Sequence, residues 1–288
     1  MSQPLMPESP KTDSLKIYLI NLDRAEERLA HMQTKLAEAG LDHERVAAVD
    51  GATLTLPHPD FDARAYRYLH GRRAIPAELG CYFSHVECAR RLLESKASHA
   101  LILEDDVTFP EDFRRLLANA LENAEDWDIL RLSSVNRGPK FPYKRLPDGR
   151  SLAIAFTREK GAGAYLINRA AAEWIVAKLM PMRLSYDIAF DLEYLDGLRA
   201  SFIDPVPVGQ RDEPVSQIQV NIRAAKYPPT RYLTVLPYRL WLETSRLAMR
   251  FWCYTRFSFR YEPRRALLRA VPTVLAVILG VDEVFFDH

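Results

Sequence analysis

The chain has 288 residues, of which 48% are hydrophobic and 10% aromatic, and it carries 39 basic and 38 acidic side chains. This apolar fraction excludes an intrinsically disordered chain, and 11 glycines exclude a collagen-like one. A net charge of +1 gives no overall attraction to nucleic acid, and three cysteines are too few for a disulfide scaffold, which favours a reducing compartment.

The charge is unevenly distributed along the chain. Residues 226–270 carry ten basic and two acidic side chains, whereas the first 225 residues sum to −4. Residues 1–14 contain three prolines and no apolar run, which predicts an unstructured lead-in rather than a signal peptide, and hence a cytoplasmic protein. We therefore expect a lead-in over 1–14, a main domain over 15–225 and a helical, basic and aromatic region over 226–288.

Hydrophobic patterning in the first third predicts a strand, a helix and a second strand. An apolar run over 15–22 predicts a buried strand. Asp23 and Glu26 stand in capping-box positions and predict a helix over 24–39 that ends at Gly40. Residues 43–49 predict the next strand, and residues 52–74 have little periodicity.

The pattern continues to residue 198 and indicates an α/β fold with a mostly parallel central sheet flanked by helices. The expected elements are a helix over 76–94, a strand over 99–103, a helix from 110, a strand over 127–132, a polar loop over 134–150, a strand over 164–167 that Asn168 caps into a helix over 169–179, and a helical segment over 186–198.

Three consecutive acids, Glu104, Asp105 and Asp106, follow the buried strand over 99–103. Ligands of open α/β sheets bind beyond the carboxyl ends of the strands. Clustered carboxylates repel one another unless a cation lies among them, and Mg²⁺ or Mn²⁺ pairs such oxygens with substrate phosphates. The triplet therefore indicates a divalent cation that holds a diphosphate. Acids that decorate a helix N-terminus, or the metal site of a phosphatase or nuclease, are the alternatives.

Several motifs occur together in one order. They are LINLDRAEER, ELGCYFSH, LILEDDV and AYLINRAA, followed by Tyr186-Asp187, Asp204-Pro205, Gly209-Gln210 and Ser216-Gln217-Ile218. In this order, over about residues 15–220, the chain resembles glycosyltransferase family 25, which contains lipopolysaccharide and collagen galactosyltransferases. The resemblance implies a GT-A-type nucleotide-sugar-binding domain, a UDP-sugar donor and inversion at the anomeric carbon.

The resemblance also implies roles for the acidic triplet. Asp106 would be the direct ligand of Mn²⁺ or Mg²⁺. Asp105 would contact the metal, the donor sugar or its ribose, and Glu104 belongs to the same donor motif. The metal would neutralise the UDP leaving group and orient it.

The remaining donor-side candidates come from the first strand–helix turn and from the end of the domain. Asn21, Arg24 and Arg28 occupy the turn where the family places uracil and ribose, and Gln210 matches a recurrent glutamine. An exposed helix face paired with nearby acids explains the two arginines equally well.

An inverting transfer needs one base to take the proton of the acceptor hydroxyl. Asp187 matches the family's downstream aspartate and is the expected base. Asp191 lies one helical turn further on and would share its face. Capping of a helix or a contribution to metal binding is the alternative for both.

Cys81, His85 and Cys88 share one helix face with a spacing that zinc could use, but a fourth ligand is lacking, so packing is favoured. Ser84 and His85 are candidates for contact with the acceptor. Gly163 would let the backbone approach a sugar or would simply make a turn.

The basic region predicts an amphipathic helix. Its apolar face contains Leu240 and Tyr254, and Arg239, Arg246 and Arg250 form a basic stripe. This pattern favours peripheral attachment to an anionic membrane, at the cytoplasmic face of a bacterial inner membrane, where lipid-linked glycans are made. A packing helix is the alternative, and no recognised module supports nucleic acid.

These features predict a metal-dependent, inverting hexosyltransferase. Galactose from UDP-galactose would be moved to a saccharide or lipid-linked glycan acceptor of lipopolysaccharide, lipooligosaccharide or a related surface glycan. A metal-dependent phosphoesterase, or a catalytically silent sugar-nucleotide-binding scaffold at the membrane, is the alternative.

Overall fold

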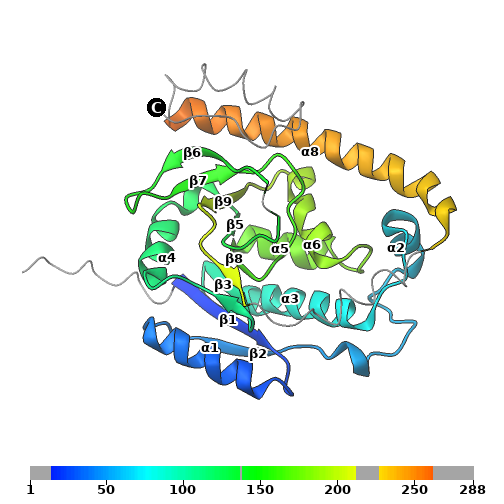
Figure 1. Ribbon diagram of the computed structural model, residues 1–288, viewed down its shortest axis with the longest axis horizontal. Coiled ribbons are helices and arrows are strands. Elements are labelled where there is room, and N and C mark those ends of the chain that lie inside the picture. The colour runs from blue at the N-terminus through cyan, green and yellow to red at the C-terminus, as the bar shows by residue number, and fades with distance from the viewer. Residues whose placement is uncertain (1–13, 137, 212–226, 262–288) are drawn as a thin grey trace, which may run out of the picture.

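A mixed sheet runs through the middle of the molecule (Figure 1). The computed structural model describes residues 14–136, 138–211 and 227–261. Within these ranges the sheet has eight strands in the order β2-β1-β3-β8-β5-β9-β7-β6. Their bounds are β1 Leu15–Asn21, β2 Glu44–Ala47, β3 His99–Glu104, β5 Ile129–Arg131, β6 Phe141–Arg145, β7 Ser151–Ile154, β8 Ala164–Asn168 and β9 Ala200–Asp204.

The sheet is mixed rather than mostly parallel in its pairing: three of its seven described neighbouring pairs are parallel and four are antiparallel. β1 is parallel to β2 and β3, and β5 is parallel to β9. β8 and β7 are each antiparallel to both of their neighbours. Six of the eight described strands therefore point the same way, so the carboxyl ends of β1, β3 and β5 lie at one edge of the sheet.

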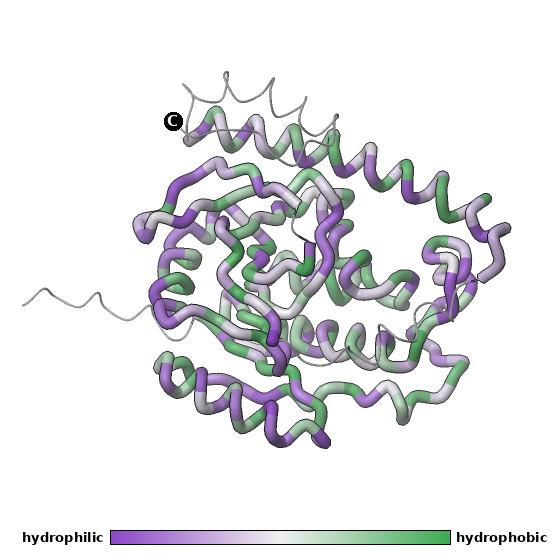
Figure 2. Tube along the Cα trace, viewed as in Figure 1, coloured by the Kyte–Doolittle hydropathy of each residue, from purple (hydrophilic) through white to green (hydrophobic). Residues whose placement is uncertain are grey.

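Helices cover both faces of the sheet. They are α1 Glu26–Glu38, α2 Ala63–His70, α3 Pro76–Glu94, α4 Phe113–Glu122, α5 Arg169–Lys178, the short α6 Tyr186–Ala189 and the long α8 Tyr232–Tyr261. Alternate side chains of β1 enter different cores. Tyr18 packs in the core of α3 and α5, and Leu19 packs in the core of α1 and α4. The α/β class is thus confirmed, and Figure 2 shows hydrophobic and hydrophilic residues alternating along the outer helices α1 and α8.

The N-terminus of α1 differs from the capping-box prediction. The helix begins at Glu26, and no side chain caps it. Asp23 instead binds Arg45 of β2, whose register partner on β1 is Leu19. The ion pair takes the carboxylate away from the backbone amides, so the helix starts later than local sequence predicts.

Two regions contain more regular structure than their patterns predict. α2 lies within 52–74, where Asp62 caps it by accepting a hydrogen bond from the Ala65 amide (2.8 Å). The β6–β7 hairpin lies partly within the expected loop over 134–150. Its strands are short, and only Tyr143 of β6 is buried, so an alternation signal is nearly absent.

α8 confirms the predicted C-terminal helix but corrects the predicted membrane-facing stripe. Arg246 and Arg250 are 0% and 5% exposed, and both bind acids of the segment after α6. Tyr254 and Phe257 join the core beside α1 and α4. Among the described helices, α8 included, none is long and apolar enough to cross a bilayer.

Candidate active site

The carboxyl ends of β1 and β3 bring Asn21 and Asp105 together. Ile20 is the register partner of Glu104, so the next residues, Asn21 and Asp105, lie side by side at the end of the two strands. The Asn21 side-chain amide donates to Asp105 Oδ2 (2.7 Å), and Arg28 lies 3.2 Å from Asp105 Oδ1. Arg45 Nε donates to Asn21 Oδ1 (3.1 Å). Asp105 is therefore a buried carboxylate with a fixed orientation and a partly compensated charge.

Asp106 stands in a different environment from Asp105. Among the described residues, its Oδ1 atom is buried without a hydrogen-bond partner. Burial, reinforced by the negative charges of Glu104 and Asp105, raises the pKa of Asp106 to about 6. An unpartnered carboxylate oxygen next to two further acids is a suitable ligand for a hard divalent cation, because such ions take oxygen ligands. The donor set therefore fits Mg²⁺ or Mn²⁺.

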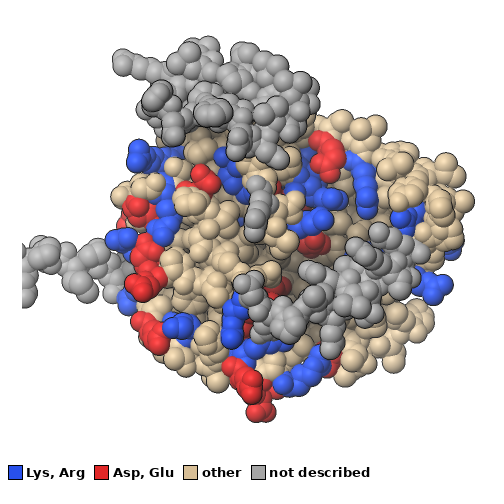
Figure 3. Space-filling model, in the orientation of Figure 1, with Lys and Arg blue, Asp and Glu red and all other residues tan. Residues whose placement is uncertain are grey.

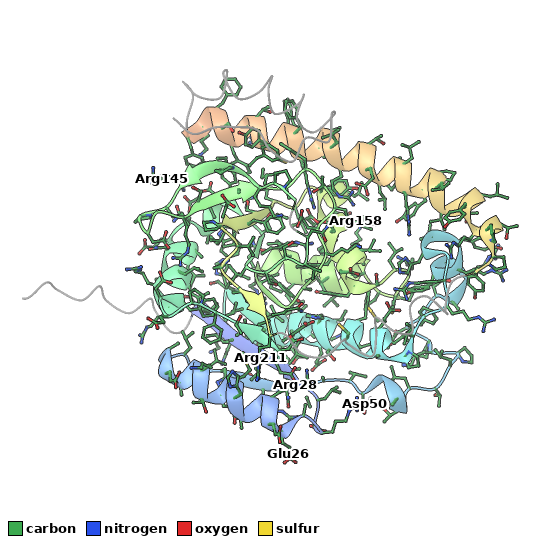
Figure 4. All side chains as sticks on the ribbon, in the orientation of Figure 1. Glu26, Arg28, Asp50, Arg145, Arg158 and Arg211 are labelled. Carbon is green, nitrogen blue, oxygen red and sulfur yellow. The ribbon has the colours of Figure 1, made fainter. Side chains whose placement is uncertain are left out.

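A two-stranded ribbon places the Gln210 segment directly against the acidic triplet. β4 (Val107–Thr108) pairs with β10 (Gly209–Gln210), with Gln210 opposite Val107. The Arg211 amide then donates to the Asp106 carbonyl oxygen (2.9 Å). Figure 4 labels the exposed Arg211 close to Arg28, and Figure 3 shows basic and acidic side chains intermixed on this face. This arrangement suits the diphosphate of a nucleotide bound to a cation.

Glu104 turns toward α3 rather than toward the arginines. Its Oε1 atom lies 3.1 Å from His85 Nε2 and 4.0 Å from Cys81 Sγ. His85 Nδ1 lies 2.9 Å from the Tyr165 hydroxyl, which lies 3.0 Å from the Tyr186 hydroxyl. Tyr186 also stacks on the His85 ring, with 4.3 Å between centroids. A buried polar chain thus joins the end of β3 to the start of α6.

Asp187 follows Tyr186 at the first turn of α6 and is half-buried. Its carboxylate accepts a hydrogen bond from the Ile188 amide (3.0 Å). Desolvation raises the pKa of the Cys81 thiol, and the nearby charges of Glu104 and Asp187 raise it further. Tyr186, the neighbour of Asp187, is joined to Glu104 through Tyr165 and His85, so Asp187 lies toward the acidic triplet.

Asp191, although it shares the helical stretch with Asp187, lies elsewhere. It is 0% exposed, and its carboxylate oxygens lie 2.8 Å from Arg250 and 3.0 Å from Arg246. Arg131 lies 3.5 Å away. A carboxylate enclosed by three guanidinium groups holds the fold together and is unsuited to receive a proton from a substrate hydroxyl.

Two further predicted residues have partners within the protein. The Ser84 hydroxyl is buried, donates to the Gly80 carbonyl (2.7 Å) and accepts from the Val49 amide (2.9 Å). Ser84 thus fastens α3 to the segment after β2. Arg24 is largely exposed and pairs with Asp50, which follows β2.

Gly163 lies against the acidic triplet. Its carbonyl accepts the Glu104 amide (2.8 Å), and a Cβ there would meet Val107 Cγ1 at 3.1 Å. The close approach of β8 to the start of β4 explains the glycine. Cys88, in contrast, lies in the core away from Cys81, so the zinc set with Cys81, His85 and Cys88 is not formed.

The family model of "Glycosyltransferase family 25 (LPS biosynthesis protein)" matches residues 14–190. The chain belongs to glycosyltransferase family 25. This match spans β1, the acidic triplet and α6, and it confirms the resemblance seen in the motifs.

The alignments with relatives in family 25 cover about half of this chain. Procollagen galactosyltransferase 1 of Danio rerio is 28% identical over 165 residues, which are 52% of this chain and 27% of the relative. A glycosyltransferase 25 family member of Anopheles gambiae is 34% identical over 128 residues, 40% of this chain and 21% of the relative. The chain spans about a quarter of the length of the curated relatives it matches.

Solved structures resemble this family 25 chain only weakly. A glycosyltransferase involved in the glycosylation of the major capsid of PBCV-1 is 10% identical with a TM-score of 0.38, over 67% of this chain and 83% of that one. A putative glucose-1-phosphate thymidylyltransferase from Bacillus anthracis is 11% identical with the same TM-score, over 76% and 99% of the two chains.

Two basic residues near the family 25 acidic motif are not identified by sequence reasoning. Arg45 orients Asn21, and Arg211 follows Gln210. The position of Arg211 next to the predicted Gln210 is the only local signal. Arg45 gives none, because its role depends on the parallel register of β1 and β2.

Proposed function

We propose that this family 25 chain transfers a hexose, galactose from UDP-galactose, with inversion to a saccharide acceptor of lipopolysaccharide or a related surface glycan. The supporting observation is that Asn21 and Arg28 hold the buried Asp105 where β1 and β3 end, next to Asp106, whose carbonyl oxygen accepts the Arg211 amide. The half-buried Asp187 follows Tyr186, which is joined to Glu104 through Tyr165 and His85. The acids and arginines suit a nucleotide diphosphate with its cation, and the aspartate supplies a base.

The donor would bind across the ends of β1 and β3. Asp105, held by Asn21 and Arg28, has a fixed oxygen for a ribose or sugar hydroxyl. Arg28 and Arg211 would face the diphosphate. Asp106, with Asp105, would hold Mn²⁺ or Mg²⁺, which when bound supplies charge neutralisation for the UDP leaving group.

Asp187 would act as the base. The acceptor oxygen attacks the anomeric carbon as the bond from that carbon to the diphosphate oxygen breaks, and the acceptor proton passes to the Asp187 carboxylate. The hydrogen bond from the Ile188 amide to Oδ1 leaves Oδ2 to accept that proton. Asp191, enclosed by arginines, has no part in this step.

A donor screen tests the proposal. UDP-sugars are supplied with Mn²⁺ and a panel of saccharide acceptors, and the products are identified by mass spectrometry. Asp187→Asn should lower transfer by about 10²–10⁴-fold, the range of general-base catalysis, and leave UDP binding within about twofold. Asp60→Asn, an exposed aspartate outside the site, is the matched control and should be unchanged.

The rival functions give different products in the same screen. Donor hydrolysis without acceptor dependence would identify a phosphoesterase. UDP binding without turnover of any donor would identify a silent scaffold. Full transfer by Asp187→Asn would remove the proposed base.

We also propose that α8 attaches the protein to an anionic membrane surface, where lipid-linked acceptors are found. Its outward side exposes seven large apolar side chains: Leu233, Leu236, Leu240, Trp241, Met249, Trp252 and Phe259. Arg256 and Arg260 are exposed on the same helix. Tryptophan and leucine flanked by arginine are suited to the interface of an anionic bilayer.

A further inference from the structure

Cys81, His85 and Glu104 form a cluster of three different ligand types. The ligand atoms all lie within 4.8 Å of one another, and they form the one such group of at least three His, Cys, Asp or Glu side chains in the described residues. Cys81 and His85 are one turn apart on α3, and Glu104 ends β3 opposite them. The separations of 3.1 Å and 4.0 Å from Glu104 Oε1 are close to the ligand–ligand spacing of a tetrahedral metal site.

The ring of His85 is oriented as metal-binding histidines usually are. Its Nδ1 atom is engaged by the Tyr165 hydroxyl (2.9 Å), and this leaves Nε2 directed at Glu104. Metal-ligating histidines nearly always form a hydrogen bond through the second ring nitrogen, which fixes the tautomer and the ring orientation. Stacking on Tyr186 adds a further restraint.

The electrostatic surroundings of Cys81 favour a cation. The half-buried Cys81 thiol lies 4.0 Å from the Glu104 carboxylate. A divalent ion between the two groups would bind both and stabilise the thiolate.

The chemistry of this cluster differs from that of Asp106. Asp105 and Asp106 offer only oxygen, which suits Mg²⁺ and Mn²⁺. A thiolate, an imidazole and a carboxylate favour Zn²⁺ or Co²⁺ over those harder ions. Glu104 belongs to the same triplet but turns its Oε1 atom to α3. Consecutive acids of the triplet therefore belong to two sites that prefer different cations.

We infer that Cys81, His85 and Glu104 form a binding site for a borderline-soft divalent cation of the Zn²⁺ type, separate from the oxygen-ligand site at Asp106. Three protein ligands leave one coordination position open to water or substrate. The inference concerns metal binding alone and does not depend on the proposed glycosyl transfer.

Cobalt titration of the full chain tests the site, because Co²⁺ bound by a thiolate shows a sulfur-to-metal charge-transfer absorption in the near ultraviolet. The wild-type protein should develop this absorption at one equivalent, and Zn²⁺ should abolish it by displacing Co²⁺. A large excess of Mg²⁺ should leave it intact, whereas displacement by Mg²⁺ would overturn the inference of two separate sites.

Variants locate the ligands. Cys81→Ser should lose the sulfur-to-cobalt absorption, and Glu104→Gln should keep it with affinity weakened at least tenfold. Cys253→Ser, which changes a half-buried thiol on α8, is the matched control and should behave as wild type. Thermal melts establish that each variant is folded. A folded wild-type protein without the absorption, or an unchanged absorption in folded Cys81→Ser, would overturn the site.

Discussion

Asp106 and Asp105 are adjacent in sequence, but only the charge of Asp105 is compensated by partners in the described residues. Asp105 has Asn21 and Arg28 as partners, whereas Asp106 has a buried oxygen without one among the described residues. The pKa of Asp106 is therefore raised from 3.8 to about 6 by burial and by its acidic neighbours. The native state binds this proton more tightly than the unfolded chain does. The resulting stabilisation is fully present below about pH 4 and is lost as the pH rises through about 6.

The raised pKa of Asp106 predicts how the stability of Asp106→Asn depends on pH. The amide cannot ionise, so the metal-free variant should be more stable than the metal-free wild type at pH 8, by ~1–3 kcal/mol, and this advantage should disappear near pH 4. Urea unfolding at the two pH values measures it. Stabilisation by UDP with Mn²⁺ should be lost in the variant.

Glu111→Gln, at an exposed acid near the start of α4, serves as the control and should change neither quantity. An Asp106→Asn protein whose stability differs from that of wild type by the same amount at both pH values would contradict the raised pKa.

At the scale of elements, α8 is fastened to the sheet domain by buried charge. Arg250 lies 2.8 Å from Asp191 and 2.6 Å from Glu193, and it donates to the Ala155 carbonyl (3.2 Å). Removing one partner of a buried ion pair leaves an uncompensated charge in the interior, which costs about 3–5 kcal/mol. Arg250→Met should therefore lower the free energy of unfolding by that amount, as measured by urea denaturation.

Two comparisons isolate the cause of that loss. Arg256→Met, on the exposed side of the same helix, should change stability by at most ~0.5 kcal/mol. Adding Glu193→Gln to Arg250→Met should restore part of the loss, because it removes the carboxylate left unpaired. If the double variant is less stable than Arg250→Met, packing rather than charge holds α8.

Elements with long, regular patterns could be predicted from sequence. β1, α3, β3 and α5 follow from apolar runs, helical spacing and the Asn168 cap, which accepts the Ala171 amide (2.9 Å). The β6–β7 hairpin could not, because so little of β6 is buried. The start of α1 could not either, because Asp23 has a partner on another strand.

The site residues that directly follow a strand could be predicted from the sequence. Those whose role depends on contacts between distant parts of the chain could not. The acidic triplet follows from its place after β3. The burial of Asp191, the role of Arg45 and the pairing of Glu104 with Cys81 arise from contacts across more than 20 residues of sequence. Helical spacing predicts that the arginines of α8 face lipid, because it cannot distinguish a solvated basic stripe from one that meets buried acids.

At the scale of the whole molecule, the two sides of α8 have different roles. One side packs on the sheet domain, and the other is exposed and is the side proposed to bind a membrane. The inner side contributes Tyr254, Phe257 and the buried arginines to the sheet domain. The outer side exposes Leu240 by 67% and Trp252 by 66%. Deletion of the helix would expose the Asp191 cluster as well as remove the apolar side, so point variants on the outer side are the informative test of membrane attachment.

Leu240→Ser with Trp252→Ser should weaken binding to vesicles of phosphatidylglycerol and phosphatidylcholine by roughly 10–100-fold, because burying each apolar side chain contributes about 1.5–3 kcal/mol and both are only partly inserted. Flotation of the full chain with such vesicles measures the change. Leu56→Ser, at a 51% exposed leucine outside α8, should float as wild type does.

Binding to the vesicles should also weaken as the salt concentration rises, since Arg256 and Arg260 contribute through charge. A wild-type protein that stays unbound at low salt, or a double variant that floats equally well, would show that the outer side of α8 meets something other than a lipid surface.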